Sequence, residues 1–460
     1  MNASELISTN PARNYEEIGR VAISTQPEIE AAVRDAHKAF PAWRTLQFSK
    51  RIEYLKSFLE FFRSQVKEIA ELQTKEMGKP LAASVGEVES AGEWLSGQFE
   101  IAEKMLQSRV LDQSDKEQTE LHLEPYGVVA AVAPWNFPAY QMFLAIMQPL
   151  LAGNTVVFKH SEECPLTSQM IAQLLDKAKL PEGVFTCLFG DGSVGQYLME
   201  QDVDLLYFTG SSRVGQQVYE LAAKKFIPAA LEMGGSSPGI VFEDAELKNS
   251  CDSIYLERFS NCGQVCSALK RLFVHSNIYD STLEKLKDLV ESQVIGDPLE
   301  PKTTVGPLVA KRQLDLLEEQ VKDAINKGAR IVAGGGRPDG LRGAFYRPTI
   351  LTDVTPDMRV MKEEVFGPVL PIIPFEAEEK VIEMANDTPY GLTAYVYTED
   401  INRANRIAKQ LEAGQVSING ANYLSKHAPF GGYKKSGIGR TDGDIGYHSF
   451  LQMKVIARPK

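Results

Sequence analysis

Apolar strand-like segments alternate with helical patterns through the middle of this 460-residue chain, and this alternation restricts the fold more than any other feature. Six such segments lie between residues 127 and 242: GVVAAVA at 127–133, NTVVF at 154–158, VFTCLF at 184–189, DLLYF at 204–208, PAALE at 228–232 and PGIVF at 238–242. Strands that are apolar throughout and are joined by helices form parallel sheets covered by helices on both faces. The segment therefore predicts an α/β unit.

A second alternating series runs from about residue 244 to 424, with strands expected near 270–275, 330–333 and 394–398. A chain of this length has room for two or three domains of ordinary size. We therefore predict two α/β domains with Rossmann-like parallel sheets.

The two ends of the chain have different patterns. Residues 1–106 are mostly helical by periodicity: Thr25 and Glu28 have capping-box spacing, and residues 49–78 form one longer amphipathic pattern that ends at Gly78. Residues 107–125 are polar and charged, which indicates an extended excursion from the core. The final strand-like segment, FLQMKVIARP, has no local pairing partner, so we expect it to pair with another subunit.

No charged residue occurs between Tyr126 and Phe158, and hydropathy alone would suggest a membrane span there. Pro134, Pro138 and Pro149 interrupt this stretch, so no apolar run of membrane-spanning length survives. We interpret it as strand, helix (139–152) and strand, and we predict no membrane association.

Composition excludes several classes of function. The formal charge of −12 makes a nucleic acid a poor partner, and 43% hydrophobic with 24% charged residues is typical of folded proteins. The five cysteines are odd in number and form no C-x-x-C pair, which favours a reducing compartment, and the six histidines show no metal-ligand spacing with them. The acidic first residues do not resemble a signal peptide. We expect a cytoplasmic protein without a metal.

Two glycine-containing segments could bind a dinucleotide. Gly190, Gly192 and Gly195 give G-x-G-x-x-G after a strand, but no acidic residue is placed to hold a ribose, and a plain glycine-rich turn explains the pattern equally simply. The segment FTGSSRVG at 208–215 places hydroxyls at a helix start, where backbone N–H groups can hold a pyrophosphate. An ordinary serine-capped helix is the alternative.

Three side chains are candidates for catalysis, each with a structural alternative. Glu232, between an apolar strand and a Gly-Gly turn, would be partly desolvated, which raises the pKa of a carboxylate toward that of a general base, although a surface glutamate would fit the same pattern. Cys266 is a nucleophile, an inert core thiol or, with Cys262, one half of a redox pair. Asn136 lies between two prolines that could aim its amide at an oxyanion, or it bonds only its own turn.

Taken together, seven ordered segments resemble the NAD(P)-dependent aldehyde dehydrogenase superfamily. They are VAPWNFP, LLAGNTVVFKHSE, FTGS, LEMGG, NCGQVC, EEVFGPV and PFGGYKKSGIGR, spread over residues 132–440. The resemblance implies oxidation of an aldehyde to a carboxylic acid through a cysteine thioester. It also implies NAD as the cofactor, with NADP as an alternative.

The resemblance assigns roles to individual residues. Cys266 would be the nucleophile, Asn136 the oxyanion donor and Glu232 the base that activates water. The implied cofactor contacts are Lys159 and Glu162 to the adenosine ribose, Ser211 to the pyrophosphate, Glu364 and Phe366 to the nicotinamide riboside, and also Trp135 and Gly210. In this interpretation the glycine motif at 190–195 loses its role to Ser211, and Glu162 would repel a 2′-phosphate.

The substrate is less well defined by the resemblance. The segments FKH at 158–160 and GGYKKSG at 431–437 resemble short bacterial succinate-semialdehyde dehydrogenases, and Ser425 matches a carboxylate-binding serine of that branch. Arginines that often hold the substrate carboxylate are replaced here by Leu144 and Ser260. Phe137, Leu144 and Phe430 would line a more apolar tunnel, so uncharged aliphatic or aromatic aldehydes stand beside succinate semialdehyde.

The same resemblance divides the chain and suggests its partners. Residues 1–106 and 126–235 would bind NAD, residues 236–428 would form the catalytic domain, and 107–125 with 441–460 would form a small β oligomerisation arm of a homodimer or homotetramer. A CoA-acylating aldehyde dehydrogenase and a non-catalytic NAD-binding member are the rivals. Glu232 opposes the first, because a hydrolytic base would destroy the thioester, and an intact Cys266, Asn136 and Glu232 oppose the second.

Overall fold

The computed structural model describes residues 4–460, and a six-stranded sheet forms the centre of its first half. The strand order is β19-β9-β8-β5-β6-β7, and all neighbours are parallel except the β19–β9 pair. The strands are β5 (Val128–Ala133), β6 (Thr155–His160), β7 (Phe185–Leu188), β8 (Leu205–Gly210), β9 (Ala229–Met233) and β19 (Gly437–Ile438). The parallel sheet predicted from the apolar alternation is confirmed.

Both faces of this sheet are covered by helices, because its strands are apolar on both sides. In β5, Val129 and Ala131 pack into one core cluster, whereas Val128 and Ala130 pack into another. The surrounding helices are α1 (Gln26–Thr45), α2 (Phe48–Arg63), α3 (Val66–Met77), α4 (Leu81–Met105), α5 (Pro138–Ala152), α6 (Pro165–Lys177), α7 (Gly192–Glu200) and α8 (Ser212–Lys225). Every residue of α5 except Tyr140 is buried, which explains the uncharged stretch.

Two features of the first half differ from the sequence prediction. The amphipathic pattern at 49–78 is two helices, α2 and α3, because the chain turns at Ser64 and Gln65 so that both helices pack on α4. Residues before α1 form a hairpin of β1 (Glu5–Asn10) and β2 (Glu16–Ala22) rather than helix. The predicted stop at Gly78 is confirmed, since this glycine ends α3 in a left-handed conformation.

A seven-stranded sheet forms the second half, in the order β12-β13-β14-β11-β10-β16-β17. Its strands are β10 (Ser237–Val241), β11 (Leu269–His275), β12 (Arg330–Ala333), β13 (Thr349–Thr352), β14 (Val369–Phe375), β16 (Thr393–Tyr397) and β17 (Gln415–Ile418). Only β12 is antiparallel to its neighbour. The strand predicted at 238–242 is β10, and it belongs to this sheet rather than to the first series.

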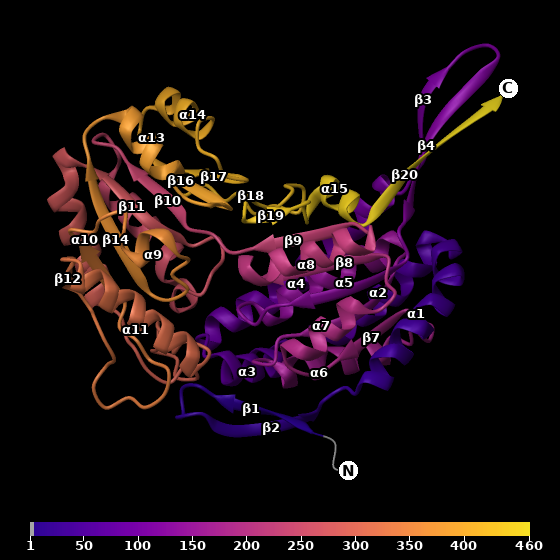
Figure 1. Cartoon of the computed structure of the whole chain (residues 1–460), viewed down its shortest axis with the longest axis horizontal. Helices are drawn as coiled ribbons and strands as arrows, with labels where there is room; N and C mark the ends of the chain where they lie inside the picture. Colours follow the sequence, from indigo (N-terminus) through magenta and orange to yellow (C-terminus); the bar gives the residue numbers. More distant parts are fainter. Residues whose placement is uncertain (1–3) are drawn as a thin grey trace.

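Helices α9 (Leu247–Phe259), α10 (Tyr279–Glu291), α11 (Lys311–Asn326), α12 (Arg359–Lys362), α13 (Glu378–Asn386) and α14 (Ile401–Ala408) belong to the second half. Figure 1 shows the two halves as separate lobes, joined where β9 leads into β10. A short antiparallel pair, β15 (Tyr390–Gly391) and β18 (Tyr433–Lys434), brings the late chain back toward the first lobe, where it forms β19 and the short helix α15 (Gly443–Gly446). Two α/β lobes with parallel sheets, as predicted, are therefore present.

A three-stranded antiparallel arm projects from the first lobe (Figure 1). It consists of β3 (Arg109–Gln113), β4 (Glu117–Pro125) and β20 (Leu451–Pro459), in the order β20-β4-β3. β20 pairs along its whole length with β4 of its own chain, and pairing with another subunit stays a prediction. Local patterns could not reveal this pairing between segments so far apart in sequence. No helix within residues 4–460 combines the length and apolarity needed to cross a membrane.

Candidate active site

A cavity of about 250 Å³ lies where the carboxyl ends of three strands of the first sheet face the second lobe. The loop after β5 contributes Asn136, the end of β8 contributes Thr209 and Gly210, β9 contributes Glu232, and the segment before β11 contributes Cys266. Ligands of open α/β sheets bind at the carboxyl ends of strands. The cavity therefore brings together the three side chains that the sequence singled out as candidates for catalysis.

Cys266 lies in an irregular segment between a single turn at Ser260–Gly263 and β11, and its side chain is half-buried. The turn is tight: Gly263 has a φ of +71°, and a Cβ there would collide with the backbone of Gly367. Burial raises the pKa of the Cys266 thiol to about 11, Glu364 and Glu232 act in the same direction, and Lys270 opposes them. Cys262 is buried in the core of the second lobe, and both thiols are free.

Asn136 is buried beside the cysteine segment. Its side-chain Nδ2 donates to the backbone carbonyl of Gln264 at 3.1 Å. The backbone carbonyl of Asn136 accepts from Asn261 Nδ2 at 2.8 Å. A carboxamide carries two N–H groups, and the Gln264 carbonyl uses one of them. The other remains available for an oxygen bound in the cavity.

A buried ion pair between Lys79 and Glu87 supports the loop that carries Asn136. Glu87 accepts from the N–H groups of Ala139 and Tyr140 at 3.0 and 3.2 Å, so it caps the amino end of α5. Lys79 pairs with Glu87, and its ammonium lies 3.8 Å from the centre of the Phe137 ring. Phe137 therefore packs against the Lys79 ammonium, and it is not among the residues that line the cavity.

Glu232 is 6% exposed, and neither carboxylate oxygen has a hydrogen-bond partner within the described chain. Burial raises the pKa of this carboxyl well above its ordinary value; Arg440 opposes the shift and Asp442 adds to it. The desolvation expected for this strand-end glutamate is thus present. A carboxylate whose pKa is raised in this way is a stronger base than an ordinary one.

A larger groove of about 640 Å³ adjoins the first cavity and contains most of the predicted cofactor residues. Lys159 is buried on β6, and its Nζ lies 3.4 Å from Glu162, which also lies 3.4 Å from Arg312. Ser211 caps α8 by accepting from the Val214 N–H. Trp135, Gly210 and Ser211 border both spaces, so the groove and the cavity are continuous.

The glycine motif at 190–195 is closer to this groove than the resemblance suggested. Gly192 and Gly195 both line it, at the start of α7, where the Asp191 side chain caps the helix. Their small size leaves the groove open at this wall. The motif therefore shapes the groove, whereas Ser211 and α8 present a helix terminus to it.

Glu364 and Phe366 line the cavity from the second lobe. Glu364 Oε1 accepts from Lys270 Nζ at 2.8 Å and from the Gly235 N–H at 3.1 Å. Phe366 meets Trp135 edge to face, with ring centres 5.5 Å apart. Both residues thus share the cavity with Cys266, and Phe366 contacts Trp135, which also borders the groove.

The predicted substrate residues divide into two pairs. Leu144 and Phe430 line the cavity, whereas Phe137 does not, and Ser425 lies exposed in a loop where its hydroxyl accepts from the His427 N–H. Sequence reasoning missed several lining residues: Gln141, Tyr207, Gln313, Leu316 and Thr441. Only Gln141 carried a local signal, since it lies one helical turn before Leu144. Among the described residues around the cavity there is no lysine, arginine or histidine.

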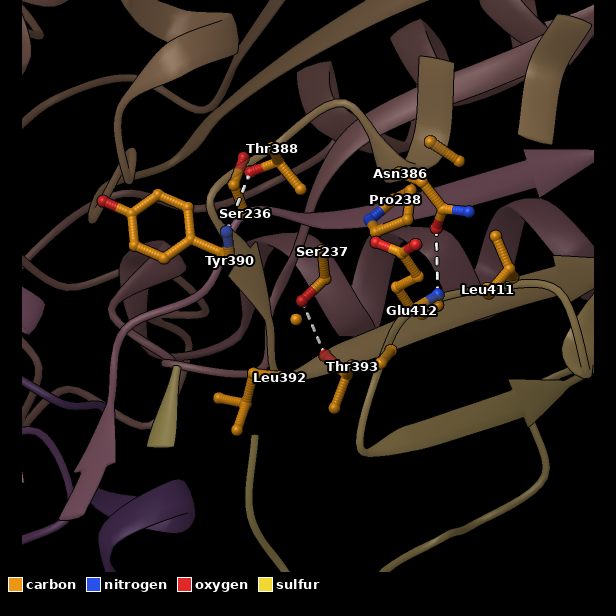
Figure 2. A pocket seen from close by; sticks show the side chains of 14 residues that line it. Ser236, Ser237, Pro238, Asn386, Thr388, Tyr390, Leu392, Thr393, Leu411 and Glu412 are labelled. Carbon is orange, nitrogen blue, oxygen red and sulfur yellow. Dashed lines mark hydrogen bonds between the residues drawn. The ribbon is translucent and has the colours of Figure 1, made fainter. Parts of the chain in front are cut away.

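A third cavity, of about 10 Å³, lies behind the Gly-Gly turn and holds none of the predicted site residues. Figure 2 shows hydroxyl groups around it, with Ser237 and Thr393 hydrogen-bonded at 2.6 Å. Thr393 in turn donates to the Ser267 carbonyl at 2.7 Å. This space is about the size of one water molecule, so its walls support the segment that carries Cys266 rather than a ligand.

Comparison with known proteins gives full-length matches. The family model described as "Aldehyde dehydrogenase family" matches residues 1–456. The NADP(+) succinate-semialdehyde dehydrogenase of Escherichia coli K12 is 37% identical over 99% of this chain and 94% of its own length, and the glutarate-semialdehyde dehydrogenase of Pseudomonas aeruginosa gives the same identity and coverage. An NAD+ complex of a Bacillus cereus aldehyde dehydrogenase superposes with a TM-score of 0.96 at 32% identity, covering 99% of this chain and 93% of that one.

Proposed function

Because this chain belongs to the aldehyde dehydrogenase family, we propose that its NAD(P)-dependent oxidation of aldehydes takes place in the 250 Å³ cavity, with Cys266 as nucleophile. One observation carries the proposal: Cys266, Asn136 and Glu232 share one cavity that opens into a groove of dinucleotide size. The three groups supply a nucleophile, an oxyanion donor and a base.

The residues can perform the reaction in a definite order. The Cys266 thiol loses its proton to solvent, and the thiolate sulfur then adds to the aldehyde carbon. The free N–H of the Asn136 amide and the backbone N–H of Cys266 would hold the resulting oxyanion. After the carbon has been oxidised, a thioester remains on Cys266. Glu232 then activates water, and hydrolysis releases the carboxylic acid.

The polar groups in the groove and at its boundary suit a nicotinamide dinucleotide. Lys159 and Glu162 can bind ribose hydroxyls, the amino end of α8 at Ser211 suits a pyrophosphate, and Glu364 can accept from the second ribose. When bound, the cofactor supplies the hydride acceptor. Trp135 and Phe366, stacked edge to face beside Cys266, would keep water away from that end of the groove.

We propose that NAD is preferred over NADP, because the Glu162 carboxylate lines the part of the groove next to Lys159. A carboxylate accepts from a ribose 2′-hydroxyl and repels a 2′-phosphate. Glu162→Ser should therefore raise kcat/KM with NADP by about tenfold, since relief of repulsion worth ~1.4 kcal/mol gives that factor.

The matched control for this cofactor prediction is Glu163→Ser. It removes the same charge one residue away, from a side chain that pairs with Arg312 and does not line the groove. The ratio of kcat/KM for the two cofactors should stay close to that of the unmodified enzyme. An equal change in both variants, or none in Glu162→Ser, would contradict the role of Glu162.

We propose uncharged aliphatic or aromatic aldehydes as the preferred substrates. The support is the lining of the cavity, where Leu144 occupies a position expected for a carboxylate-binding arginine and Ser425 lies outside. Burying a substrate carboxylate without a hydrogen-bonding or charged partner lowers the affinity for that substrate by several-fold to about a hundred-fold. Hexanal and benzaldehyde should therefore give kcat/KM about tenfold above succinate semialdehyde, measured by NADH absorbance.

This substrate proposal has a direct counter-test. Leu144→Arg would introduce a cation into the cavity, and it should move the preference toward succinate semialdehyde. A strong preference of the unmodified enzyme for the semialdehyde would contradict the proposal. The same assay with and without CoA tests the CoA-acylating alternative, for which the relatives described above give no support.

We also propose the division of labour along the chain. Residues 1–106 with 126–235 would bind the cofactor and 236–428 would form the catalytic domain. The arm, 107–125 with 441–460, would join copies into a homodimer or homotetramer. Exposed apolar side chains on the arm, among them Val110, Met453 and Val455, support a second copy as its partner.

Five free thiols favour a reducing compartment, which we propose to be the cytoplasm.

A further inference from the structure

Lys270 is a fully buried lysine four residues after Cys266, at the start of β11. Burying an ammonium is costly unless its charge and its N–H groups are matched. Here Nζ donates to the Cys266 carbonyl at 2.8 Å and to Glu364 Oε1 at 2.8 Å. The ammonium also lies 5.5 Å from the centre of the Phe366 ring. Both hydrogen bonds and the ring contact of this buried charge are thus with residues proposed to act in the site.

The Glu364 carboxylate extends the connection to a third part of the site. Its Oε1 also accepts from the Gly235 N–H at 3.1 Å, and a Cβ on Gly234 would collide with its Oε2. These two glycines follow Glu232 directly after β9. Lys270 therefore connects the backbone of the nucleophile, the riboside-binding carboxylate and the turn that follows the base.

Four charged side chains determine the electrostatic environment of the Cys266 thiol and of Lys270: Glu232, Glu364, Lys270 and Arg258. Glu364 and Glu232 both raise the pKa of Cys266, and Lys270 is the side chain that lowers it. Arg258, buried behind the same segment, faces Lys270 and Glu364 and donates to the carbonyls of the 365–369 loop. Burial lowers the pKa of Lys270, and the pairing with Glu364 opposes that shift.

We propose that Lys270 is a positioning residue that fixes the Cys266 backbone against Glu364 and supplies the positive charge that favours the Cys266 thiolate. The proposal deepens the proposed function, on which the roles of Cys266 and Glu364 rest. Neither the sequence motifs nor the comparisons gave Lys270 a role. A cation near a thiol stabilises the thiolate because the two charges attract in a poorly solvated place.

The test is the pH dependence of alkylation of Cys266 by iodoacetamide in the full-length enzyme without cofactor, followed by mass spectrometry of the peptide that contains this residue. Only the thiolate reacts, so the rate follows its fraction. Lys270→Met should move the midpoint of the profile upward by roughly one pH unit, which makes alkylation about tenfold slower at a fixed pH below it. The KM for NAD should also rise, since Glu364 loses its cationic partner and keeps only the Gly235 N–H.

Two further variants distinguish the charge of Lys270 from general packing. Lys270→Gln is neutral but can still donate to the Cys266 carbonyl, so it should show the same upward shift and replaces the methionine variant if that one does not fold. Lys327→Met removes another lysine of the second lobe that pairs with carboxylates, Asp323 and Asp357, and that does not line the cavity, so its alkylation profile should match that of the unmodified enzyme. An unshifted profile in a folded neutral variant at position 270 overturns the proposal.

The alkylation test of Lys270 does not depend on whether Cys266 is the catalytic nucleophile. Alkylation is read at the Cys266 peptide itself, whereas the role of Cys266 in turnover is read by the serine variant. If aldehyde oxidation survives replacement of Cys266, the proposed function fails, while a shifted alkylation profile would still establish the effect of Lys270 on this thiol.

Discussion

Cys266→Ser should lower the rate of aldehyde-dependent NADH formation by at least about 1,000-fold, because the oxidation needs a nucleophile that adds to the carbonyl carbon before hydride can leave. A serine hydroxyl is far less acidic than a thiol, and no base in the cavity is strong enough to ionise it to a useful extent. The site has only limited means to ionise even the thiol, whose pKa is raised to about 11. The measurement is steady-state NADH absorbance with hexanal and with succinate semialdehyde.

The control for this variant is Cys262→Ser. Cys262 lies in the same segment, is free and points into the core of the second lobe. Most of the activity should remain, because this thiol does not line the cavity. Equal losses in the two variants would favour the redox-pair interpretation, and undiminished oxidation by Cys266→Ser would remove the thioester mechanism altogether. Binding of NAD, followed by tryptophan fluorescence, should survive in both.

The sequence predicted the strands of the first sheet well, because parallel strands buried on both faces are continuous apolar runs. Its five parallel strands appear within a few residues of their predicted positions, from β5 at Val128–Ala133 to β9 at Ala229–Met233, whereas the short antiparallel strand β19 was not predicted. The second sheet was harder to predict. Its strands at 349–352 and 415–418 are only four residues long, and they contain polar residues that their tertiary contacts bury. Short strands of this kind carry little periodicity.

Contacts between distant parts of the chain account for the other differences. Nothing near residue 451 indicates that β20 pairs with β4, and nothing near residue 64 indicates that α2 and α3 turn to pack on α4. In the site, motifs predicted that Cys266, Asn136 and Glu232 belong together. They could not predict that Phe137 packs on Lys79 or that Lys270 reaches Glu364, because these contacts depend on side-chain directions set by the complete fold.

Glu232→Gln should preserve a rapid first turnover but reduce steady-state turnover by about 100-fold or more, because the glutamine amide cannot accept a proton from water. Hydrolysis of the thioester would then become rate-limiting, and NADH should appear as a burst of one equivalent per active subunit. Mixing enzyme, NAD and hexanal in a stopped-flow instrument separates the two phases. Mass spectrometry of the stalled variant should detect the acyl group on Cys266.

The pH profile gives a second reading of the same variant. Glu232 acts as a base only when ionised, and its pKa lies well above the ordinary carboxyl value because it is buried without hydrogen-bond partners in the described chain. Steady turnover of the unmodified enzyme should therefore rise as the pH increases through that raised pKa, and fall below it as the carboxylate becomes protonated. In Glu232→Gln this rise should be absent from the remaining slow phase. A steady rate equal to that of the unmodified enzyme, with the rise intact, would assign the activation of water to another group.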